Sequence, residues 1–394
     1  MDKLKNLFTK LNQDPHLQQP KTVPKNPAHI KPSPYHIAWP PRLTCSPKVL
    51  GEVTDLSNRR FPRDIGRSIQ LAGHTYYIFG DTFCFDSCDE FRGVTNNTIA
   101  LIPDLSNPTK SQYLSNKHRI PEFVPLSKEE KKYCDDHEKR GENKRYVNWV
   151  FGGLIERPGS DRREGWVFYD TVEIHGATPV HQCGIGVAKA RVTDLSTGAI
   201  ECERVGSFPL FDPSGPAWGN MSNIAAQDGW TYMLTNRELD NYMARIRTED
   251  DFSNAQNYQF LRKGGEWVTS YCAPYGPFGE LAHDVLAGQG QGSILYIPDF
   301  APKGRPYLWV GCDKFLSSRL FVGAAPRPEG PWDVHDLGEM PKINGDQSKT
   351  RYCIFAHEWS IRGEEGGGIR VLVSWSDDGT MGGKVGIGWF TFAV

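Results

Sequence analysis

Short runs of hydrophobic and aromatic residues recur along the chain and are separated by Gly, Asn, Asp and Pro. Each run begins just after a glycine or a turn-forming cluster and ends in polar residues, which is the pattern of a β-strand bounded by turns. The clearest runs are 74–83, 165–173, 229–238, 305–314 and 369–378. The sequence therefore predicts a series of similar central strands.

Each central strand is flanked by two further apolar runs, so the repeated unit is a hairpin followed by a third strand. The preceding runs are 65–71, 148–155, 221–226, 290–297 and 352–360. The following runs are 97–102, 184–192, 242–248, 319–325 and 384–392. Radial repetition of this unit predicts an all-β fold, a five-bladed β-propeller. A double-sheet sandwich is the alternative, but it does not explain the repeat.

Two segments depart from the repeat. Residues 1–48 are predicted to form an irregular Pro-rich N-terminal arm, because the prolines between Pro15 and Pro41 prevent regular structure. Residues 49–394 are expected to form a single propeller domain. A charged insertion at about 119–146 mixes basic and acidic residues, so we expect a solvated helix or loop between the first two blades.

Composition narrows the function classes. The 40 Gly and 28 Pro among 394 residues favour many turns over a helical bundle, and 38% hydrophobic residues suffice for a core. A net charge of −2 provides no field for nucleic acid or an anionic membrane. No apolar run is long enough for a membrane span, and the N-terminal sequence lacks the apolar region of a secretion signal. With nine scattered cysteines, these features lead us to expect a cytoplasmic protein.

Polar residues on the first strand of each blade are candidates for substrate binding. In a propeller these strands line the central axis, where polar groups can surround a small polar ligand. The alternative, that they bond to one another or to water, stays open. The candidate substrate-binding residues are Arg63, Asn148, Glu156, Asn220, Asn223, Gln291 and His357.

Asp64 and Asp81 are the strongest candidates for chemistry. A hairpin that turns at Ala72–Gly73 places them directly opposite each other, and opposed carboxylates repel, so one should retain a proton near neutral pH. Such a pair suits acid–base or nucleophilic work on an acetal. A bulge would separate them, and Asp170 in a similar strand ending allows a turn-forming role for Asp81 instead. Glu358 is the third catalytic candidate.

The sequence contains no motif that requires a cofactor or a metal. No nucleophile elbow, zinc-protease motif or phosphate-binding loop is present, and the glycines at 288–292 lack the Lys-Ser/Thr of a phosphate loop. We therefore expect no cofactor, no metal, and a small-molecule partner, either a sugar or an apolar metabolite.

The first-blade sequence RDIGRSIQLAGHTYYIFGDTF resembles the motif of a propeller family described as a domain of unknown function, which includes bacterial endo-D-arabinanases. The string FAHEWS followed by VLVSWS is similar to the final blade of that family, without its usual proline. The resemblance covers about residues 50–394 and points to a filamentous-fungal branch. It implies a five-bladed propeller shaped like furanosidases, with Asp64 and Asp81 as the acid–base or nucleophile pair.

Three hypotheses for the function follow. The first, which the motif favours, is a glycosidase-like hydrolase that acts on a small glycoside or furanosidic sugar by a paired-carboxylate mechanism. The alternative is a non-hydrolytic cyclase, isomerase or dehydratase of fungal secondary metabolism, with aromatic residues enclosing a water-poor pocket. The third is a binding propeller without catalysis.

Overall fold

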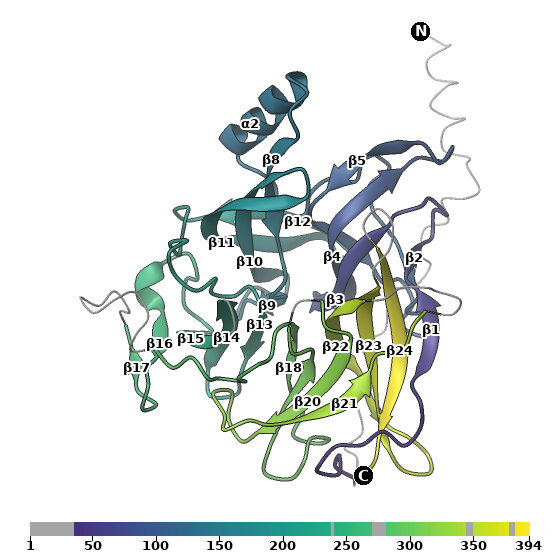
Figure 1. Ribbon diagram of the computed structural model, residues 1–394, viewed down its shortest axis with the longest axis vertical. Coiled ribbons are helices and arrows are strands. Elements are labelled where there is room, and N and C mark those ends of the chain that lie inside the picture. The colour runs from purple at the N-terminus through teal and green to yellow at the C-terminus, as the bar shows by residue number, and fades with distance from the viewer. Residues whose placement is uncertain (1–34, 238–239, 270–280, 315, 344–349, 378–382) are drawn as a thin grey trace.

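The computed structural model describes residues 35–394 except 238–239, 270–280, 315, 344–349 and 378–382. Its strands form five separate antiparallel sheets in chain order, which confirms the predicted five-bladed β-propeller (Figure 1). The innermost strands are β3, β9, β13, β18 and β22, and each contacts the next around a closed ring. The central axis therefore runs between strands drawn from all five blades.

The first two blades contain the longest hairpins. Blade one consists of β3 (Arg63–Leu71), β4 (His74–Phe85), β5 (Phe91–Thr95) and β6 (Thr98–Leu101). Blade two consists of β8 (Lys144–Trp149), β9 (Leu154–Glu156), β10 (Glu164–His175), β11 (Thr178–Asp194) and β12 (Ala199–Val205). Two short parallel strands, β2 (Thr54–Asp55) and β7 (Lys110–Ser111), lie beside blade one.

The last three blades follow the same meander. Blade three consists of β13 (Ser222–Ala225), β14 (Trp230–Arg237), β15 (Asp240–Arg247), β16 (Gln259–Leu261) and β17 (Trp267–Val268), with a 3₁₀ turn, η1 (Ala255–Asn257). Blade four consists of β18 (Gly292–Tyr296), β19 (Tyr307–Gly311), β20 (Arg319–Ala325) and β21 (Asp333–Glu339). Blade five consists of β22 (Arg351–Gly363), β23 (Ile369–Asp377), β24 (Lys384–Phe392) and β1 (Lys48–Glu52).

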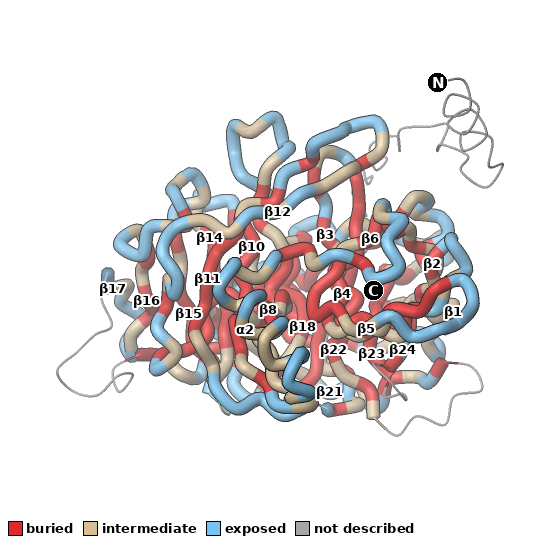
Figure 2. The backbone as a smooth tube through the Cα atoms, turned by 90° about the horizontal axis from the view of Figure 1, so that it is seen from above, coloured by how far each residue is buried: buried red, intermediate tan, exposed pale blue. Residues whose placement is uncertain are grey.

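Apolar side chains pack between neighbouring blades, which explains the aromatic content of the central strands. Trp309 and Trp375 are fully buried in two of these interfaces. The strands are buried through most of their length while the connecting loops are exposed (Figure 2). Alternate side chains of each central strand face the two adjacent blades, so both faces of a blade are covered.

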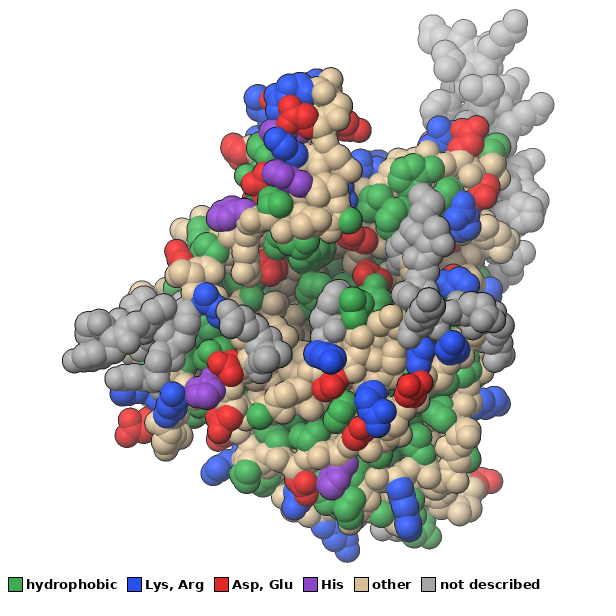
Figure 3. All heavy atoms as spheres, viewed as in Figure 1, with side chains coloured by type: hydrophobic (Ala, Val, Ile, Leu, Met, Phe, Trp, Pro, Cys, Tyr) green, Lys and Arg blue, Asp and Glu red, His purple; other side chains and the backbone are tan. Residues whose placement is uncertain are grey.

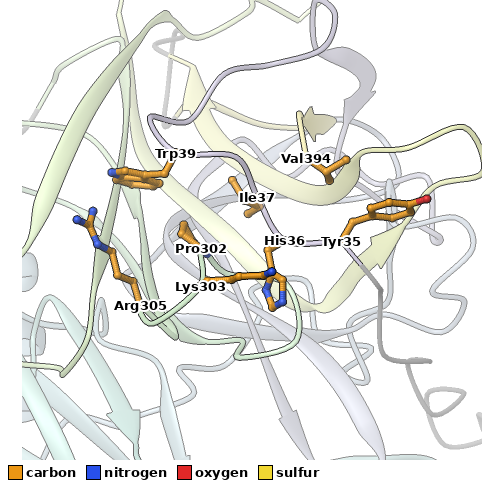
Figure 4. A pocket seen from close by; sticks show the side chains of 8 residues that line it. All are labelled: Tyr35, His36, Ile37, Trp39, Pro302, Lys303, Arg305 and Val394. Carbon is orange, nitrogen blue, oxygen red and sulfur yellow. The ribbon is translucent and has the colours of Figure 1, made fainter.

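The segment before the propeller packs against it from residue 35 onward. Ile37 is buried in the cluster shared by blades four and five. Trp39 donates a hydrogen bond from Nε1 to Asp333 Oδ2 at 2.7 Å. A pocket of about 490 Å³ lies where this segment crosses the 302–305 loop, beside Val394 (Figure 4).

The charged insertion forms helix α2 (Lys128–Lys139), which projects from blade two (Figure 1). Ser127 and Glu130 form a reciprocal capping box at its start, and none of its residues is buried. Tyr133 donates a hydrogen bond to Glu173 on β10, at 2.7 Å, and thereby anchors the helix. Among the described residues, no helix has the length and apolar character needed to cross a membrane.

Candidate active site

The β3–β4 hairpin carries Asp64 and Asp81, and a bulge separates them from regular pairing. The strands pair regularly from the Ala72–Gly73 turn until the register shifts on both sides of Ile65. Ile65 and the following Gly66 have φ angles of 71° and 74°, a left-handed conformation that is rare for a β-branched residue. The predicted direct opposition of the two aspartates is therefore replaced by a bulge that positions Asp64.

The Asp64 carboxyl group is held in a confined position. It lies over Gly80, where an added Cβ would be 2.4 Å from Asp64 Oδ1. Tyr352 donates a hydrogen bond from its hydroxyl to Asp64 Oδ2 at 3.0 Å, whereas the buried Oδ1 has no partner among the described residues. Burial and the charge of Asp81 raise the pKa of Asp64 to about 7, although the Tyr352 hydrogen bond opposes this.

The surroundings of Asp81 stabilise its negative charge better than those of Asp64 do. Asn96 donates a hydrogen bond from Nδ2 to Asp81 Oδ1 at 2.9 Å. Burial raises the pKa of Asp81, while the Asn96 hydrogen bond, the charge of Arg145 and the Trp149 indole act to lower it. The structure thus brings the two predicted carboxylates together in unequal surroundings, with Asp64 suited to carry the proton and Asp81 suited to be ionised.

Two strained residues support the hydrogen bond between Asp64 and Tyr352. Ile65 directly follows Asp64, and Cys353, with a φ angle of 51°, directly follows Tyr352. The Cys353 backbone N–H donates to Gln291 Oε1 at 3.2 Å, which fixes this part of β22. Backbone strain of this kind persists only where the surrounding structure enforces it, and it concentrates at functional sites.

Aromatic side chains form the wall beside the carboxylate pair. Trp149, Phe151 and Tyr352 are half-buried, and the rings of Trp149 and Phe151 are 6.2 Å apart. Figure 3 shows the molecule hollowed near the centre of this face, with acidic and hydrophobic side chains in the hollow. Phe151 and Tyr352 pack on a small buried cluster consisting of Ile65, Cys353 and Phe355. Sequence reasoning had not assigned these aromatics to the site.

Asp170 is a further buried carboxyl group that sequence reasoning treated as turn-forming. It is the direct cross-strand partner of Trp149, so both side chains lie on the same face of blade two. Gln182 donates from Nε2 to both carboxylate oxygens of Asp170, at 3.3 Å to Oδ1 and 3.1 Å to Oδ2. Burial raises the pKa of Asp170 to about 7. The similarity of FYDTV to FGDTF was the sequence signal for this residue.

Arg67 closes the propeller axis. Its guanidinium donates to the backbone carbonyls of Met221, at 2.9 Å, and Gly292, and lies 4.2 Å from the centre of the Phe355 ring. Burial lowers the pKa of Arg67 to about 9, so it remains protonated at neutral pH. Arg67 on β3 therefore links blade one to residues of blades three, four and five at the centre of the ring.

Three of the predicted substrate-binding residues lie inside the protein. Arg63 is 1% exposed, donates to Ser111 Oγ at 2.8 Å and stacks on the Phe79 ring. Asn148 is equally buried and donates from Nδ2 to the backbone carbonyls of Val124 and Pro125. His357 is fully buried with Nδ1 2.6 Å from Ser68 Oγ, and burial lowers its pKa to about 3. The structure does not bring these side chains to the aspartate pair.

The remaining amides are half-buried but largely bonded to the protein. Asn223 donates to the carbonyls of Gly152 and Gly219 at 3.0 Å and 2.9 Å. The Oε1 atom of Gln291 accepts from the Cys353 backbone. Asn220 Oδ1 accepts from the Thr235 hydroxyl at 2.9 Å. These bonds hold the inner strands together, which is the structural alternative that the sequence left open.

The two predicted glutamates lie away from the aspartate pair. Glu156 forms an ion pair with Arg162, at 3.0 Å, at the far end of its strand. Glu358 is exposed and lies six residues along β22 from Tyr352, a distance of about 20 Å in a strand. No cluster of three or more His, Cys, Asp or Glu in the described part of the chain is arranged to hold a metal ion.

Comparisons with known proteins identify the fold. The sequence matches no protein-family profile and no curated protein. A Bacteroides ovatus protein, provisionally described as a hydrolase, matches the structure with a TM-score of 0.53 and 15% identity, over 88% of this chain and 87% of that chain. At this identity the likeness shows the fold alone.

Two carbohydrate-active enzymes match less closely. An exo-β-1,3-galactanase from Clostridium thermocellum has a TM-score of 0.47 and 12% identity, over 87% of this chain and 62% of that chain. An α-L-arabinofuranosidase from Lactobacillus brevis has a TM-score of 0.40 and 7% identity, over 84% of this chain and 90% of that chain. Neither likeness is close enough to assign residues in the site.

Proposed function

We propose that the protein is a glycosidase-like hydrolase that cleaves a small glycoside with Asp64 and Asp81. The observation that carries this proposal is the pair of adjacent, half-buried carboxyl groups in unequal surroundings: the pKa of Asp64 is raised to about 7, and Asp81 is bonded to Asn96. Two carboxyl groups whose environments separate their protonation states are the requirement for acid–base cleavage of an acetal.

In the proposed reaction, Asp64 donates its proton to the glycosidic oxygen as the bond to the anomeric carbon breaks. The electron pair of that bond stays with the leaving oxygen, which departs as a hydroxyl group. Ionised Asp81 stabilises the positive charge that develops at the anomeric carbon. Water supplies the new oxygen at that carbon, and its proton restores Asp64. Tyr352 donates a hydrogen bond to Asp64 Oδ2 and thereby holds the orientation of the Asp64 carboxyl group.

Two further observations support the proposal. The first-blade sequence around Asp64 and Asp81 resembles that of a family that includes bacterial endo-D-arabinanases. The Bacteroides ovatus protein with the same fold is provisionally described as a hydrolase.

The test is a screen of aryl furanosides and pyranosides with the wild-type protein and with the Asp64→Asn and Asp81→Asn variants. We expect each variant to lose ~10³-fold or more in kcat/KM, since each removes one half of the acid–base pair. Asp161→Asn is the matched control, because Asp161 is exposed in a turn at a φ of 51° that asparagine tolerates. Full activity in either site variant would refute the assignment.

A further inference from the structure

The polar lining of the hollow is smaller than the inner-strand sequence implies. The side chains of Asn148 and His357 are buried, and Asn223 donates from Nδ2 to two backbone carbonyls. Gln291 Oε1 is occupied by the backbone of β22. Few of the predicted amides are therefore available to replace the water around the hydroxyl groups of a second or third sugar.

The available surface beside the carboxylates is aromatic. The Trp149 side chain lowers the pKa of Asp81 through a hydrogen bond, and its ring lies 6.2 Å from that of Phe151. Tyr352 is bonded to Asp64. These rings therefore border both carboxyl groups. Aromatic surface that stays exposed to water is energetically unfavourable. A flat or aliphatic ligand group that covers these rings would remove that unfavourable exposure.

The two arginines nearest this wall are hydrogen-bonded to protein groups. The guanidinium of Arg67 is committed to backbone carbonyls and to the Phe355 ring. Arg145 donates to Asn143 Oδ1 at 3.2 Å and to the Gly176 carbonyl at 3.4 Å. The local arrangement thus combines an acid–base pair with an apolar wall.

We propose that the substrate is a small glycoside with an apolar aglycone, and that Trp149 and Phe151 bind this aglycone while the carboxylates act on the glycosidic bond. This inference rests on the proposed function and specifies the leaving group. It predicts that the aglycone, rather than additional sugar units, determines specificity.

The test measures binding and turnover separately. Affinities are measured by titration calorimetry for S-linked glycosides of one sugar with phenyl, octyl, methyl and glucosyl aglycones. We expect the phenyl and octyl compounds to bind ~30-fold more tightly than the methyl compound, as burial of a ring or chain on an apolar surface allows. Phe151→Ala should remove most of this preference, because it should weaken binding of the phenyl and octyl compounds far more than binding of the methyl compound. Trp230→Ala is the control, because Trp230 lies on blade three under Arg245 and Arg247.

The outcomes separate this inference from the proposed function. Equal affinity for the methyl and phenyl compounds, or tightest binding of the glucosyl compound, would overturn the aglycone assignment even if O-linked glycosides are cleaved. Retention of the phenyl preference in Phe151→Ala would also overturn it. An aglycone preference without cleavage of any matching O-glycoside, or with loss of water and no sugar release, would instead refute hydrolysis and leave an apolar binding site.

Discussion

Replacing Asp64 with asparagine should stabilise the protein in alkaline solution. The folded state raises the pKa of this carboxyl group from 3.8 to about 7, so folding favours its protonated form. Stability must then fall as the pH rises from the unfolded pKa to the folded pKa, because the folded state binds the proton more tightly in that window. The full shift corresponds to an upper bound on the order of 4 kcal/mol above neutral pH. Asp64→Asn keeps the shape of the side chain and removes this cost.

The assay is equilibrium unfolding in urea at about pH 5 and about pH 8, on wild type and variant. We expect Asp64→Asn to be more stable than wild type at the higher pH by ~1 kcal/mol or more, with a smaller difference at the lower pH. Asp86→Asn is the control, because hydrogen bonds lower the pKa of Asp86 to about 2 and its ionisation is constant across this range. A stability difference that does not change with pH would refute the reasoning.

Three other substitutions test the surroundings of the pair. Tyr352→Phe removes a hydrogen bond that lowers the pKa of Asp64, so the limb of the pH–activity profile assigned to Asp64 should move up by ~1 pH unit, and an unmoved limb would contradict this. Gly80→Ala places a methyl group 2.4 Å from Asp64 Oδ1. It should reduce kcat/KM by ~10²-fold while the free energy of unfolding falls by only ~1–3 kcal/mol. Wild-type kinetics in this variant would show that the position of the carboxyl group is unimportant. Arg67→Ala removes the hydrogen bonds from the guanidinium to two carbonyls and should lower the melting temperature. Added guanidinium at low millimolar concentration should restore the melting temperature more than an equal concentration of sodium chloride does. Equal effects of both salts would exclude an axial guanidinium site.

The fold could be predicted because it is encoded locally. A central run such as 305–314 starts after turn residues, has an apolar centre and ends in polar residues, and the structure forms β19 (Tyr307–Gly311) within it. Repetition of this pattern makes a propeller the simplest arrangement that covers both faces of every sheet. The domain boundary at residue 48 stays a prediction, and most of the predicted arm, residues 1–34, lies outside the described residues.

The active site could be predicted only in part. Proximity of Asp64 and Asp81 follows from a hairpin turn, whereas the bulge at Ile65 depends on contacts with blade five, including the hydrogen bond from its backbone N–H to Ser376 Oγ at 2.9 Å. Strand pairing deduced from a hairpin turn gives no information about a partner such as Ser376 in another blade. Likewise, an amide such as Asn148 reads the same in sequence whether it binds ligand or backbone, and only the packed structure decides.

The last blade is completed by a strand from the other end of the chain. β1 (Lys48–Glu52) pairs with β24 (Lys384–Phe392), so the outer strand of blade five is synthesised first and finds its partner last. Until the C-terminal strand is made, β1 has no edge to pair with and the ring cannot close. Closure then links residues more than three hundred positions apart, a contact of the kind that slows folding. The Asp64–Tyr352 hydrogen bond joins blade one to blade five, which closure of the ring holds together, so the carboxylate pair acquires its final geometry only when the ring is complete.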